Sequence, residues 1–517
     1  MKTGIRIGMR AAESRFALRA NQGHFRTAAL AALCSWAALW IQAFAAAPPR
    51  PNVIFIMADD LGYTDLGCYG SRYYESPAID RMAQEGMRFT SGYTAGPNCQ
   101  PTRAALMSGQ HTARTGVYTV GSIERFNWRS RPLRPVDNVV ALDPKTVTIA
   151  EALQQAGYKT ALFGKWHLGE DAAHHPLAQG FDEAIVSAGR HFDFVTRPKV
   201  DSPPGTYLAD FLTDKAVDFI RRHKDKPFFL CLHHFAVHSP HQAKSNLVAR
   251  FQNKPAAGGH NSPVYAAMIA SVDESVGRVL ATLQELNLAS NTLVIFTSDN
   301  GGVGGYAREG IQGGSITDNA PLRGGKGMLY EGGIRVPYIF WWPGKIQSAA
   351  TCDEPIHSVD LYPTLLELAG AKPPAKQPLD GMSYADLLLS GGRSARERKP
   401  LFWHFPGYLG AGGGTWRTTP VGVIRSGDWK LMEFFEDGHL ELYNLRADIG
   451  EKNNVAFQEQ ERAVAMHQQL LRWRKEIGAP MPTPNAESGS ASPPTERGKT
   501  RAGRAGRKGN TATTTTE

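Results

Sequence analysis

Short apolar segments alternate with longer amphipathic segments along most of the chain. Four short runs rich in β-branched and aromatic residues predict buried strands at residues 53–57, 160–163, 228–233 and 293–297. Apolar residues recur with helical spacing at 146–156, 207–222 and 264–286. Continuous apolar strands that alternate with helices are typical of an α/β fold. We therefore predict a large, mostly parallel central sheet flanked by helices on both faces.

Each predicted strand is followed closely by a dense group of polar residues. These groups are Asp59-Asp60, Lys165-Trp166-His167, His238-Ser239-Pro240-His241 and Asp299-Asn300. Open α/β sheets bind ligands at the carboxyl ends of their strands. The four groups therefore predict a single site assembled from distant parts of the sequence.

The pattern changes in the last part of the chain, after a composition shift near residues 373–377. Short strands joined by Gly/Asp turns are predicted at 401–405, 422–425, 429–435 and 440–443, followed by a helix at 458–477. We expect a smaller C-terminal antiparallel sheet with this helix packed on it. The expected organisation is a catalytic domain at 48–390, a small α+β subdomain at 395–482 and a disordered basic tail at 483–517.

The pattern of the N-terminal residues indicates a targeting segment. Basic residues are followed by an uncharged apolar run at 27–47, which holds the small-residue pattern Ala43-Phe44-Ala45 near its end. We interpret residues 1–47 as a signal peptide, so the mature protein would be periplasmic, secreted or at the cell surface, with no membrane contact after cleavage. An uncleaved membrane anchor is the alternative.

Charge and cysteine content narrow the functional classes further. Residues 1–26 contribute +5 of the net charge of +9 and residues 483–517 contribute +3, so the body of the 517-residue chain is nearly neutral. This distribution gives no electrostatic reason to expect a nucleic-acid partner. Five irregularly spaced cysteines, at positions 34, 68, 99, 231 and 352, form no disulfide framework.

Cys99 lies in a segment with unusual local chemistry, Gly96-Pro97-Asn98-Cys99-Gln100-Pro101-Thr102-Arg103. An apolar helical stretch follows, and a proline close to a helix start is favourable. Cys99 is therefore expected near a helix N-terminus, where the backbone favours negative charge. Two interpretations remain open on this segment alone: a reactive thiolate and an inert buried cysteine.

The pattern Cys-x-Pro-x-Arg at residues 99–103 resembles the signature of type I sulfatases in the alkaline phosphatase superfamily. The downstream segments Met107-Ser108-Gly109-Gln110-His111 and Arg114-Thr115-Gly116 resemble the extended form of that signature. Thr102 departs from the more usual Ser or Ala but keeps a hydroxyl. The resemblance covers about residues 51–480. It implies that a formylglycine-generating enzyme oxidises Cys99 to Cα-formylglycine (3-oxoalanine).

The two acidic strand-end groups supply candidate metal ligands. Asp59, Asp60, Asp299 and Asn300 offer hard oxygen donors, which suit Ca²⁺ or Mg²⁺ rather than zinc. Either pair alone could be a helix cap or a turn, but both pairs after similar apolar strands favour a metal site. The resemblance implies that these four residues hold Ca²⁺ together with an oxygen of the modified Cys99, and Mg²⁺ is the alternative.

The resemblance also assigns roles to the basic residues. It implies that Lys165 and Lys326 bind the sulfate oxygens and that His167 contacts formylglycine. His238 would contact both the sulfate and the leaving group, and Arg103 would support the formylglycine and the anionic centre. Lys165, His238 and Lys326 are therefore the expected substrate-binding residues.

The expected function is hydrolysis of a sulfate ester, of a sulfated carbohydrate or an aryl sulfate. The resemblance implies a formylglycine-hydrate nucleophile and a covalent sulfo-enzyme intermediate. One alternative is a formylglycine-dependent phosphodiester or phosphonate monoester hydrolase, and another is an inactive protein that binds sulfated glycans. We expect the loops at 120–138, 188–204 and 407–419 to determine the substrate.

Overall fold

The computed structural model describes residues 50–394, 396–412 and 415–486. The chain divides into two compact units, Met1–Pro51 and Asn52–Glu517, and the fold described below is that of the second. The predicted signal peptide at 1–47 lies outside the described residues, as does the predicted tail from residue 487 onward. Within the described ranges, no helix has the length and apolar character needed to cross a membrane.

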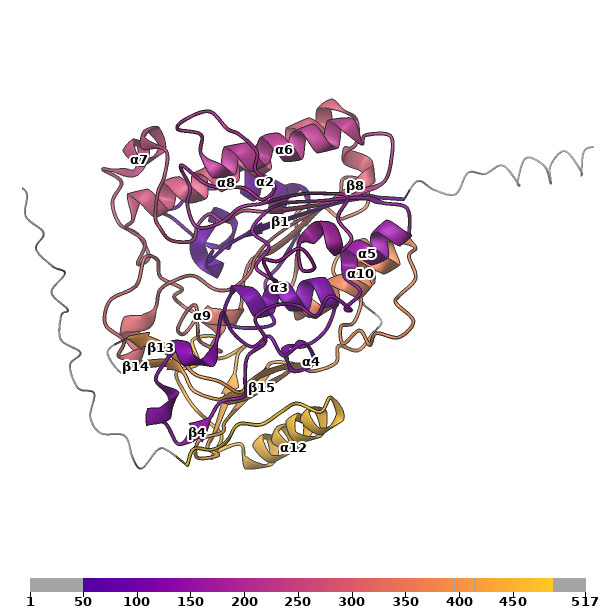
Figure 1. Ribbon diagram of the computed structural model, residues 1–517. Helices are drawn as coiled ribbons and strands as arrows, with labels where there is room; N and C mark the ends of the chain where they lie inside the picture. Colours follow the sequence, from indigo (N-terminus) through magenta and orange to yellow (C-terminus); the bar gives the residue numbers. More distant parts are fainter. Residues whose placement is uncertain (1–49, 395, 413–414, 487–517) are drawn as a thin grey trace, which may run out of the picture. The chain divides into compact units, whose positions relative to one another are not determined.

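An eight-stranded sheet forms the centre of this unit, as predicted (Figure 1). In spatial order its strands are β10 (Ala350–Cys352), β2 (Met87–Phe89), β9 (Tyr338–Trp341), β8 (Thr292–Ser298), β1 (Asn52–Ala58), β7 (Phe228–His233), β5 (Lys159–Gly164) and β6 (Glu183–Val186). Within this sheet only β9 runs antiparallel to its neighbours. The four strands predicted from the sequence are the neighbouring strands β8, β1, β7 and β5, so their carboxyl ends lie side by side.

Helices cover both faces of the sheet, because β1 is apolar on both sides. Ile54 and Ile56 pack into a core shared with α2 (Pro77–Glu85), α6 (Leu208–Arg222) and α8 (Pro263–Glu285). Val53 and Phe55 pack into a second core, shared with α3 (Cys99–Ser108), α5 (Ile149–Gln155) and α10 (Leu361–Ala369). Successive strand residues point to opposite faces, so an unbroken apolar strand needs a helical layer on each side.

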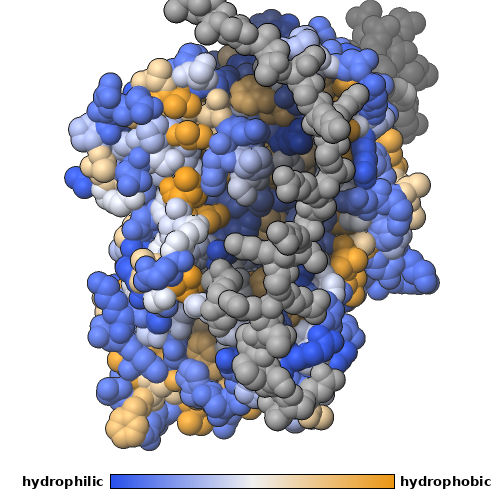
Figure 2. All heavy atoms as spheres, turned by 60° about the vertical axis from the view of Figure 1, so that its left-hand side comes forward, coloured by the Kyte–Doolittle hydropathy of each residue, from blue (hydrophilic) through white to orange (hydrophobic). Residues whose placement is uncertain are grey.

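Smaller elements complete the catalytic part of the chain. They are α4 (Thr112–Thr115), α7 (Ser245–Phe251), α9 (Glu331–Ile334), α11 (Ala385–Leu389), β3 (Gly92–Tyr93) and β11 (Ile356–His357). Figure 2 shows one face of the molecule, on which hydrophilic residues predominate and hydrophobic residues lie scattered among them. Scattered apolar residues of this kind are usual on protein surfaces.

The smaller C-terminal sheet and its helix are also confirmed. Antiparallel strands β12 (Leu401–Phe405), β15 (Val421–Ser426), β16 (Trp429–Phe434) and β17 (Leu440–Asn444) form the sheet. The helix α12 (Gln460–Glu476) packs Leu470 and Trp473 against one face of it. A separate hairpin of β13 (Leu409–Gly412) and β14 (Thr415–Thr418) extends from the same region.

The disordered tail was predicted to start at residue 483, and the structure corrects this boundary. Thr483–Pro484 form strand β18, which pairs with β4 (Leu133–Arg134). Asn485 then donates to the backbone carbonyl of Arg131 at 2.8 Å. Composition alone suggested disorder from residue 483, but pairing with a segment about 350 positions away in the sequence orders these residues.

Buried histidines make the stability of the fold sensitive to acid. Burial lowers the pKa of His404 to about 4, and its Nε2–H donates to the carbonyl of Pro480 at 2.7 Å. The unfolded chain takes up a proton near pH 6.5, whereas the folded chain does not until about pH 4. The contribution of His404 to stability is therefore present above pH 6.5 and is lost as the pH falls toward 4.

Replacing His404 with glutamine, which keeps a donor for Pro480, is expected to remove this titration. Between pH 7 and pH 5 the free energy of unfolding should then fall by about 2 kcal/mol less than in the wild type. Urea unfolding at the two pH values measures the difference. An unchanged loss of stability in His404→Gln would contradict the assignment.

Candidate active site

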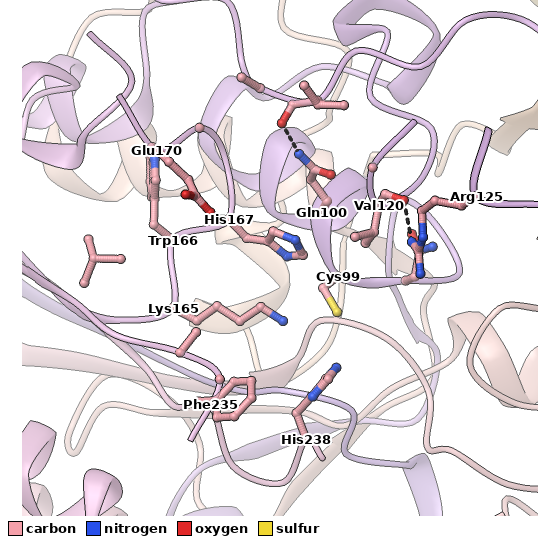
Figure 3. A pocket seen from close by; sticks show the side chains of 18 of the residues that line it. Cys99, Gln100, Val120, Arg125, Lys165, Trp166, His167, Glu170, Phe235 and His238 are labelled. Carbon is pink, nitrogen blue, oxygen red and sulfur yellow. Dashed lines mark hydrogen bonds between the residues drawn. The ribbon is translucent and has the colours of Figure 1, made fainter. Parts of the chain in front are cut away.

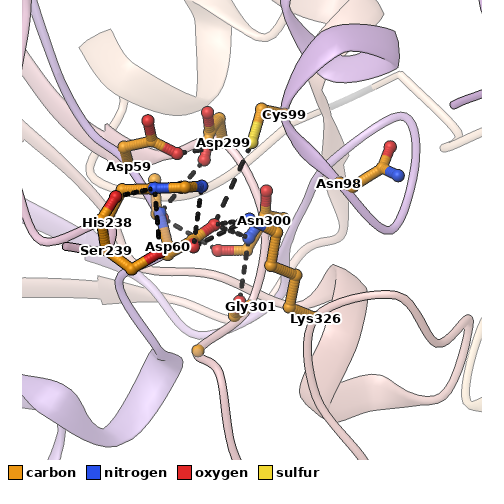
Figure 4. A network of polar contacts seen from close by, with 12 residues as sticks. Asp59, Asp60, Asn98, Cys99, His238, Ser239, Asp299, Asn300, Gly301 and Lys326 are labelled. Atoms are coloured by element: carbon orange, nitrogen blue, oxygen red, sulfur yellow. Dashed lines mark hydrogen bonds and ion pairs between the residues drawn. The ribbon is translucent and has the colours of Figure 1, made fainter. Parts of the chain in front are cut away.

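The strand-end groups predicted to form one site do lie together. Asp59, Lys165 and Asp299 directly follow strands β1, β5 and β8, and His238 lies five residues beyond β7, the strand between β1 and β5. Cys99 reaches the same point from the first turn of α3 (Figure 4). Parallel strands end at one edge of a sheet, so the strand-end residues Asp60 and Asn300, 240 positions apart in sequence, are brought into contact there.

Cys99 is the first residue of α3, as expected, but its thiol is not acidic. Its Sγ donates to Oδ1 of Asp59 at 3.3 Å and lies 4.0 Å from Oδ1 of Asp60. Burial raises the pKa of the thiol, and the nearby carboxylates of Asp299 and Asp59 raise it further. The cysteine is therefore a neutral thiol near pH 7. The reactive-thiolate interpretation is wrong for the unmodified residue, because the carboxylates and burial outweigh the helix N-terminus.

Asp59 and Lys165 form a buried ion pair beside the thiol. Nζ of Lys165 lies 2.5 Å from Oδ2 of Asp59, and both side chains are almost fully buried. Burial by itself raises the pKa of Asp59, but the positive charges of Lys165, His238, Arg103 and Lys326 outweigh it and hold the pKa below its usual range. Asp59 is thus a carboxylate, able to act as a ligand or a charge partner.

Three side chains besides the Cys99 thiol meet at Asp60. Nζ of Lys326 lies 2.6 Å from its Oδ1, and Nδ2 of Asn300 donates to that same oxygen at 2.8 Å. Nε2 of His238 lies 3.6 Å from its Oδ2. Asp60 has a backbone φ of 66°, a left-handed conformation that an aspartate adopts at some cost. Tyr265 holds this turn by donating its hydroxyl to the Asp60 carbonyl at 3.1 Å.

Arg103 is held at the base of the site by hydrogen bonds. Its guanidinium donates to Oδ2 of Asp299 through Nε and Nη2, at 3.0 and 2.7 Å, and to the carbonyl of Lys165 at 2.7 Å. It is 1% exposed. Arg103 therefore links the helix that carries Cys99 to the strand ends that carry Lys165 and Asp299.

The two predicted histidines differ in their surroundings. Burial, with the charges of Lys165 and Arg103, lowers the pKa of His167 to about 3, and its Nδ1 is buried without a hydrogen-bond partner. His238 is more open and lines the cavity: its Nδ1–H donates to the carbonyl of Ser239 at 2.6 Å, which leaves Nε2 on the side of the Asp60 carboxylate. His167 is thus a neutral imidazole at pH 7.

The donor set fits a hard divalent cation. Asp59, Asp60, Cys99 and His238 offer ligand atoms that all lie within 4.8 Å of one another. Oδ1 of Asn300 is buried without a hydrogen-bond partner beside them, and such an orphaned oxygen is what a cation would satisfy. Of the predicted ligands, Asp299 is the least available. Its Oδ2 accepts from Arg103 and its Oδ1 from the backbone N–H of Asp60.

A cavity of about 1290 Å³ opens above this cluster, with Cys99, Lys165, His167 and His238 directed toward it (Figure 3). All three loops expected to determine the substrate line its walls. Their lining residues include Val120, Arg125 and Phe126, then Ala188, Val195 and Arg197, and finally Leu409, Gly410 and Arg417. The cavity is thus built jointly by the catalytic part and the hairpin β13–β14.

Several residues of the cavity were not identified from the sequence. Glu170, Phe235 and Arg417 line it, and Tyr306 lies beneath Lys326 and donates its hydroxyl to the Lys326 carbonyl at 2.8 Å. None of them belongs to a motif, so only the folded arrangement reveals them. Glu170 is a partial exception, because it lies three residues after the predicted His167.

Comparisons with known proteins agree with this geometry. The family model described as "Sulfatase" matches residues 51–371, and the one described as "N-sulphoglucosamine sulphohydrolase, C-terminal" matches residues 325–476. The chain is 37% identical over 512 residues to a "Sulfatase" of Formosa agariphila, covering 83% of this chain and 90% of that protein. It is 36% identical over 381 residues to human N-acetylgalactosamine-6-sulfatase, with 69% of each chain covered.

A solved structure of a similar protein also matches this chain. Ps i-CgsB in complex with k-i-k-neocarrahexaose matches with a TM-score of 0.69 and 30% identity, covering 82% of this chain and 92% of that chain. The residues 51–371 that match the "Sulfatase" family model include every strand-end group of the site. The chain belongs to the sulfatase family, whose members are sulfuric ester hydrolases.

Proposed function

We propose that this sulfatase hydrolyses a sulfate ester of a sulfated carbohydrate, with Cys99, oxidised to formylglycine, as its nucleophile. The observation that carries the proposal is the position of Cys99, whose side chain faces the Asp59 and Asp60 carboxylates at the base of a cavity of about 1290 Å³. As an unmodified residue it is a neutral, buried thiol, which is a poor nucleophile. The hydrate of the aldehyde would supply two hydroxyls on one carbon, one to attack sulfur and one to release sulfate.

The size of the cavity and the charged side chains on its walls support a carbohydrate. Its walls carry charged and imidazole groups, including Arg125, Glu170, His174, His175 and Arg197. Such groups hydrogen-bond to sugar hydroxyls but would be costly to bury against a sterol. Two of the similar proteins point the same way, since their names refer to a sulfated amino sugar and to a carrageenan oligosaccharide.

The basic residues can each take one part of the reaction. Lys165 and Lys326, which here neutralise Asp59 and Asp60, would face the sulfate oxygens once a cation takes over those carboxylates. His238 lines the cavity with its Nε2 beside Asp60, and from there it would protonate the leaving alcohol. His167 is neutral at pH 7 and lines the same cavity, so it would accept the proton when sulfate is released.

A Ca²⁺ ion bound by Asp59, Asp60, Asp299 and Asn300 would supply positive charge against the sulfate. Adding Ca²⁺ to chelator-treated protein is expected to raise the free energy of unfolding by about 2.7 kcal/mol at one hundred times the dissociation constant. Thermal unfolding measures this shift without any substrate. The shift should disappear in Asp60→Asn and persist in Asp437→Asn, an exposed aspartate in a turn of the small sheet. Equal shifts in both variants would contradict the site.

Parallel assays of sulfate and phosphate esters test the reaction itself. Purified protein with oxidised Cys99 is expected to hydrolyse 4-nitrophenyl sulfate and sulfated sugars faster than 4-nitrophenyl phosphate or bis(4-nitrophenyl) phosphate. A phosphodiester rate higher by orders of magnitude would favour a phosphodiesterase or phosphonate hydrolase instead. Glycan binding without turnover, despite confirmed oxidation, would favour an inactive binding protein.

Two parts of the proposal depend on the sequence. Residues 1–47 are proposed to direct export, so the enzyme would act in the periplasm, at the cell surface or in the medium. A formylglycine-generating enzyme is proposed to meet the chain before it folds, because Cys99 is 2% exposed in the folded protein. N-terminal sequencing of protein recovered outside the cytoplasm would test the first part.

A further inference from the structure

Arg417 stands out in the outer part of the cavity. It lies on β14, and its guanidinium carbon lies 4.3 Å from the centre of the Tyr306 ring. Tyr306 in turn donates to the carbonyl of Lys326, one of the proposed sulfate-binding residues. One aromatic ring therefore separates Arg417 from the base of the site, and Arg417 borders the cavity next to Lys326 and Gly327.

Among the described residues, none compensates the charge of Arg417 with an ion pair. In the ranges that the structure describes, no carboxylate lies within ion-pair distance of it, whereas the nearby Arg323 pairs with Glu309 at 3.0 Å. Its Nε is also enclosed without a hydrogen-bond partner. A partly desolvated cation without a counter-ion is unfavourable, so the free protein holds a group that an external anion would stabilise.

A second arginine lies on the same wall. Arg125 lines the cavity, stacks on Phe126 at 5.4 Å and donates to the carbonyl of Val120, and among the described residues it too has no carboxylate partner. Phe126 meets Trp416, the neighbour of Arg417, in an edge-to-face contact at 6.3 Å. The two arginine-bearing segments are thus packed together, which fixes the wall before a ligand arrives.

The rim of the cavity is electrostatically one-sided. Glu170 and Asp171 also line it, and their side chains are 88% and 67% exposed. In Figure 3, Glu170 and Arg125 lie on opposite sides of Cys99. Glu170 is paired with Arg197 at 3.3 Å, so this side offers no net positive charge. An anion attached to the substrate would be attracted to the Arg125 and Arg417 side only.

We propose that Arg417, with Arg125 beside it, forms an anion subsite that selects sulfate esters whose sugar chain carries a second anionic group. A planar guanidinium binds either a sulfate or a carboxylate through two parallel hydrogen bonds, so either group would serve. The inference rests on the proposed function, because it places the ester to be cleaved at Cys99 and the second anion at the cavity wall.

Equilibrium binding to the full-length Cys99→Ala protein tests this without turnover. Three disaccharide probes would be titrated by calorimetry at fixed ionic strength: one with a single sulfate, one with a second sulfate on the neighbouring sugar, and one with a carboxylate there. We expect at least one doubly anionic probe to bind about ten-fold more tightly than the singly sulfated probe. The arm that shows the preference identifies the second anion.

In Cys99→Ala/Arg417→Ala this preference should fall to about two-fold or less, and Arg417→Lys, which keeps the charge, should restore part of it. The matched control is Arg462→Ala, which removes an arginine stacked on Trp429 at the same 4.3 Å but outside the cavity, and it should keep the full preference. A preference that survives Arg417→Ala, or that is absent before any change at Arg417, would overturn the subsite. Failure of the proposed function would show differently, as absence of turnover by the oxidised wild type.

Discussion

Replacing Cys99 with alanine is expected to lower kcat/KM for sulfate esters by about 10⁴-fold or more, because the nucleophile itself is removed. Cys99 lies at the base of the cavity, and its side chain meets both Asp59 and Asp60. Alanine retains the helical position and removes only the reacting group. Initial rates with 4-nitrophenyl sulfate, measured at equal Ca²⁺, give the ratio.

The matched control is Cys68→Ala, which removes a thiol that lies outside the active-site cavity. Its activity should stay within about two-fold of the wild type. The mass of the active wild-type peptide that contains residue 99 should be about 18 Da lower than that of the thiol form, since CH₂SH is replaced by CHO. An unmodified thiol in fully active protein, or wild-type rates in Cys99→Ala, would rule out the nucleophile.

Replacing Lys430 with methionine is expected to destabilise the fold by about 3–5 kcal/mol at pH 9. Nζ of Lys430 lies 3.0 Å from Oε1 of Glu331 and 2.8 Å from Oε1 of Glu451, and all three side chains are fully buried. Without the lysine, two buried carboxylates face each other. Glu331 begins α9, which follows the loop of Lys326, so the small sheet also supports the active site through this contact.

The loss of stability caused by Lys430→Met should depend on pH. Burial and the neighbouring Glu331 raise the pKa of Glu451 to about 7, although Lys430 lowers it. Losing Lys430 raises this pKa further. Below pH 6 Glu451 is protonated with or without the lysine, so the destabilisation by Lys430→Met is smaller there and grows as the pH rises from 7 to 9.

Urea unfolding of the wild type and Lys430→Met at pH 6 and pH 9 measures this effect. The double variant Lys430→Met/Glu451→Gln should recover part of the loss at pH 9, because Glu331 keeps Arg335 as a partner at 3.2 Å. Lys452→Met removes an exposed lysine nearby and should change stability by less than about 0.5 kcal/mol. A pH-independent loss, or no recovery in the double variant, would contradict the charge argument.

The central strands could be predicted because each is apolar on both faces. Residues 160–163 were predicted as a strand and β5 spans Lys159–Gly164, a difference of one residue at each end. The outer strands β2 and β10 were not predicted, since three residues carry too little periodicity. The antiparallel direction of β9 has no local signal either, because it depends on which neighbours β9 pairs with.

The candidate site was likewise predictable only where it has a local pattern. A polar group at the end of a buried strand is a local pattern, so Asp59, Lys165, His238 and Asp299 could be placed at one edge. The anion subsite was not predictable: Arg417 lies in a β-hairpin without a motif, and its significance comes from Tyr306, 111 positions earlier in the chain, beneath its guanidinium.

By itself, therefore, the sequence determined the family, the layered sheet, the small C-terminal sheet with its helix, and the chemical types gathered at the strand ends. These follow from local periodicity and from a short motif around Cys99. Only the tertiary structure decided that Cys99 is a neutral thiol, that Lys430 joins two buried carboxylates, and that no described carboxylate pairs with Arg417. The reason is physical: burial and charge interactions depend on distances in space, and the groups that set them lie tens to hundreds of residues apart in the chain.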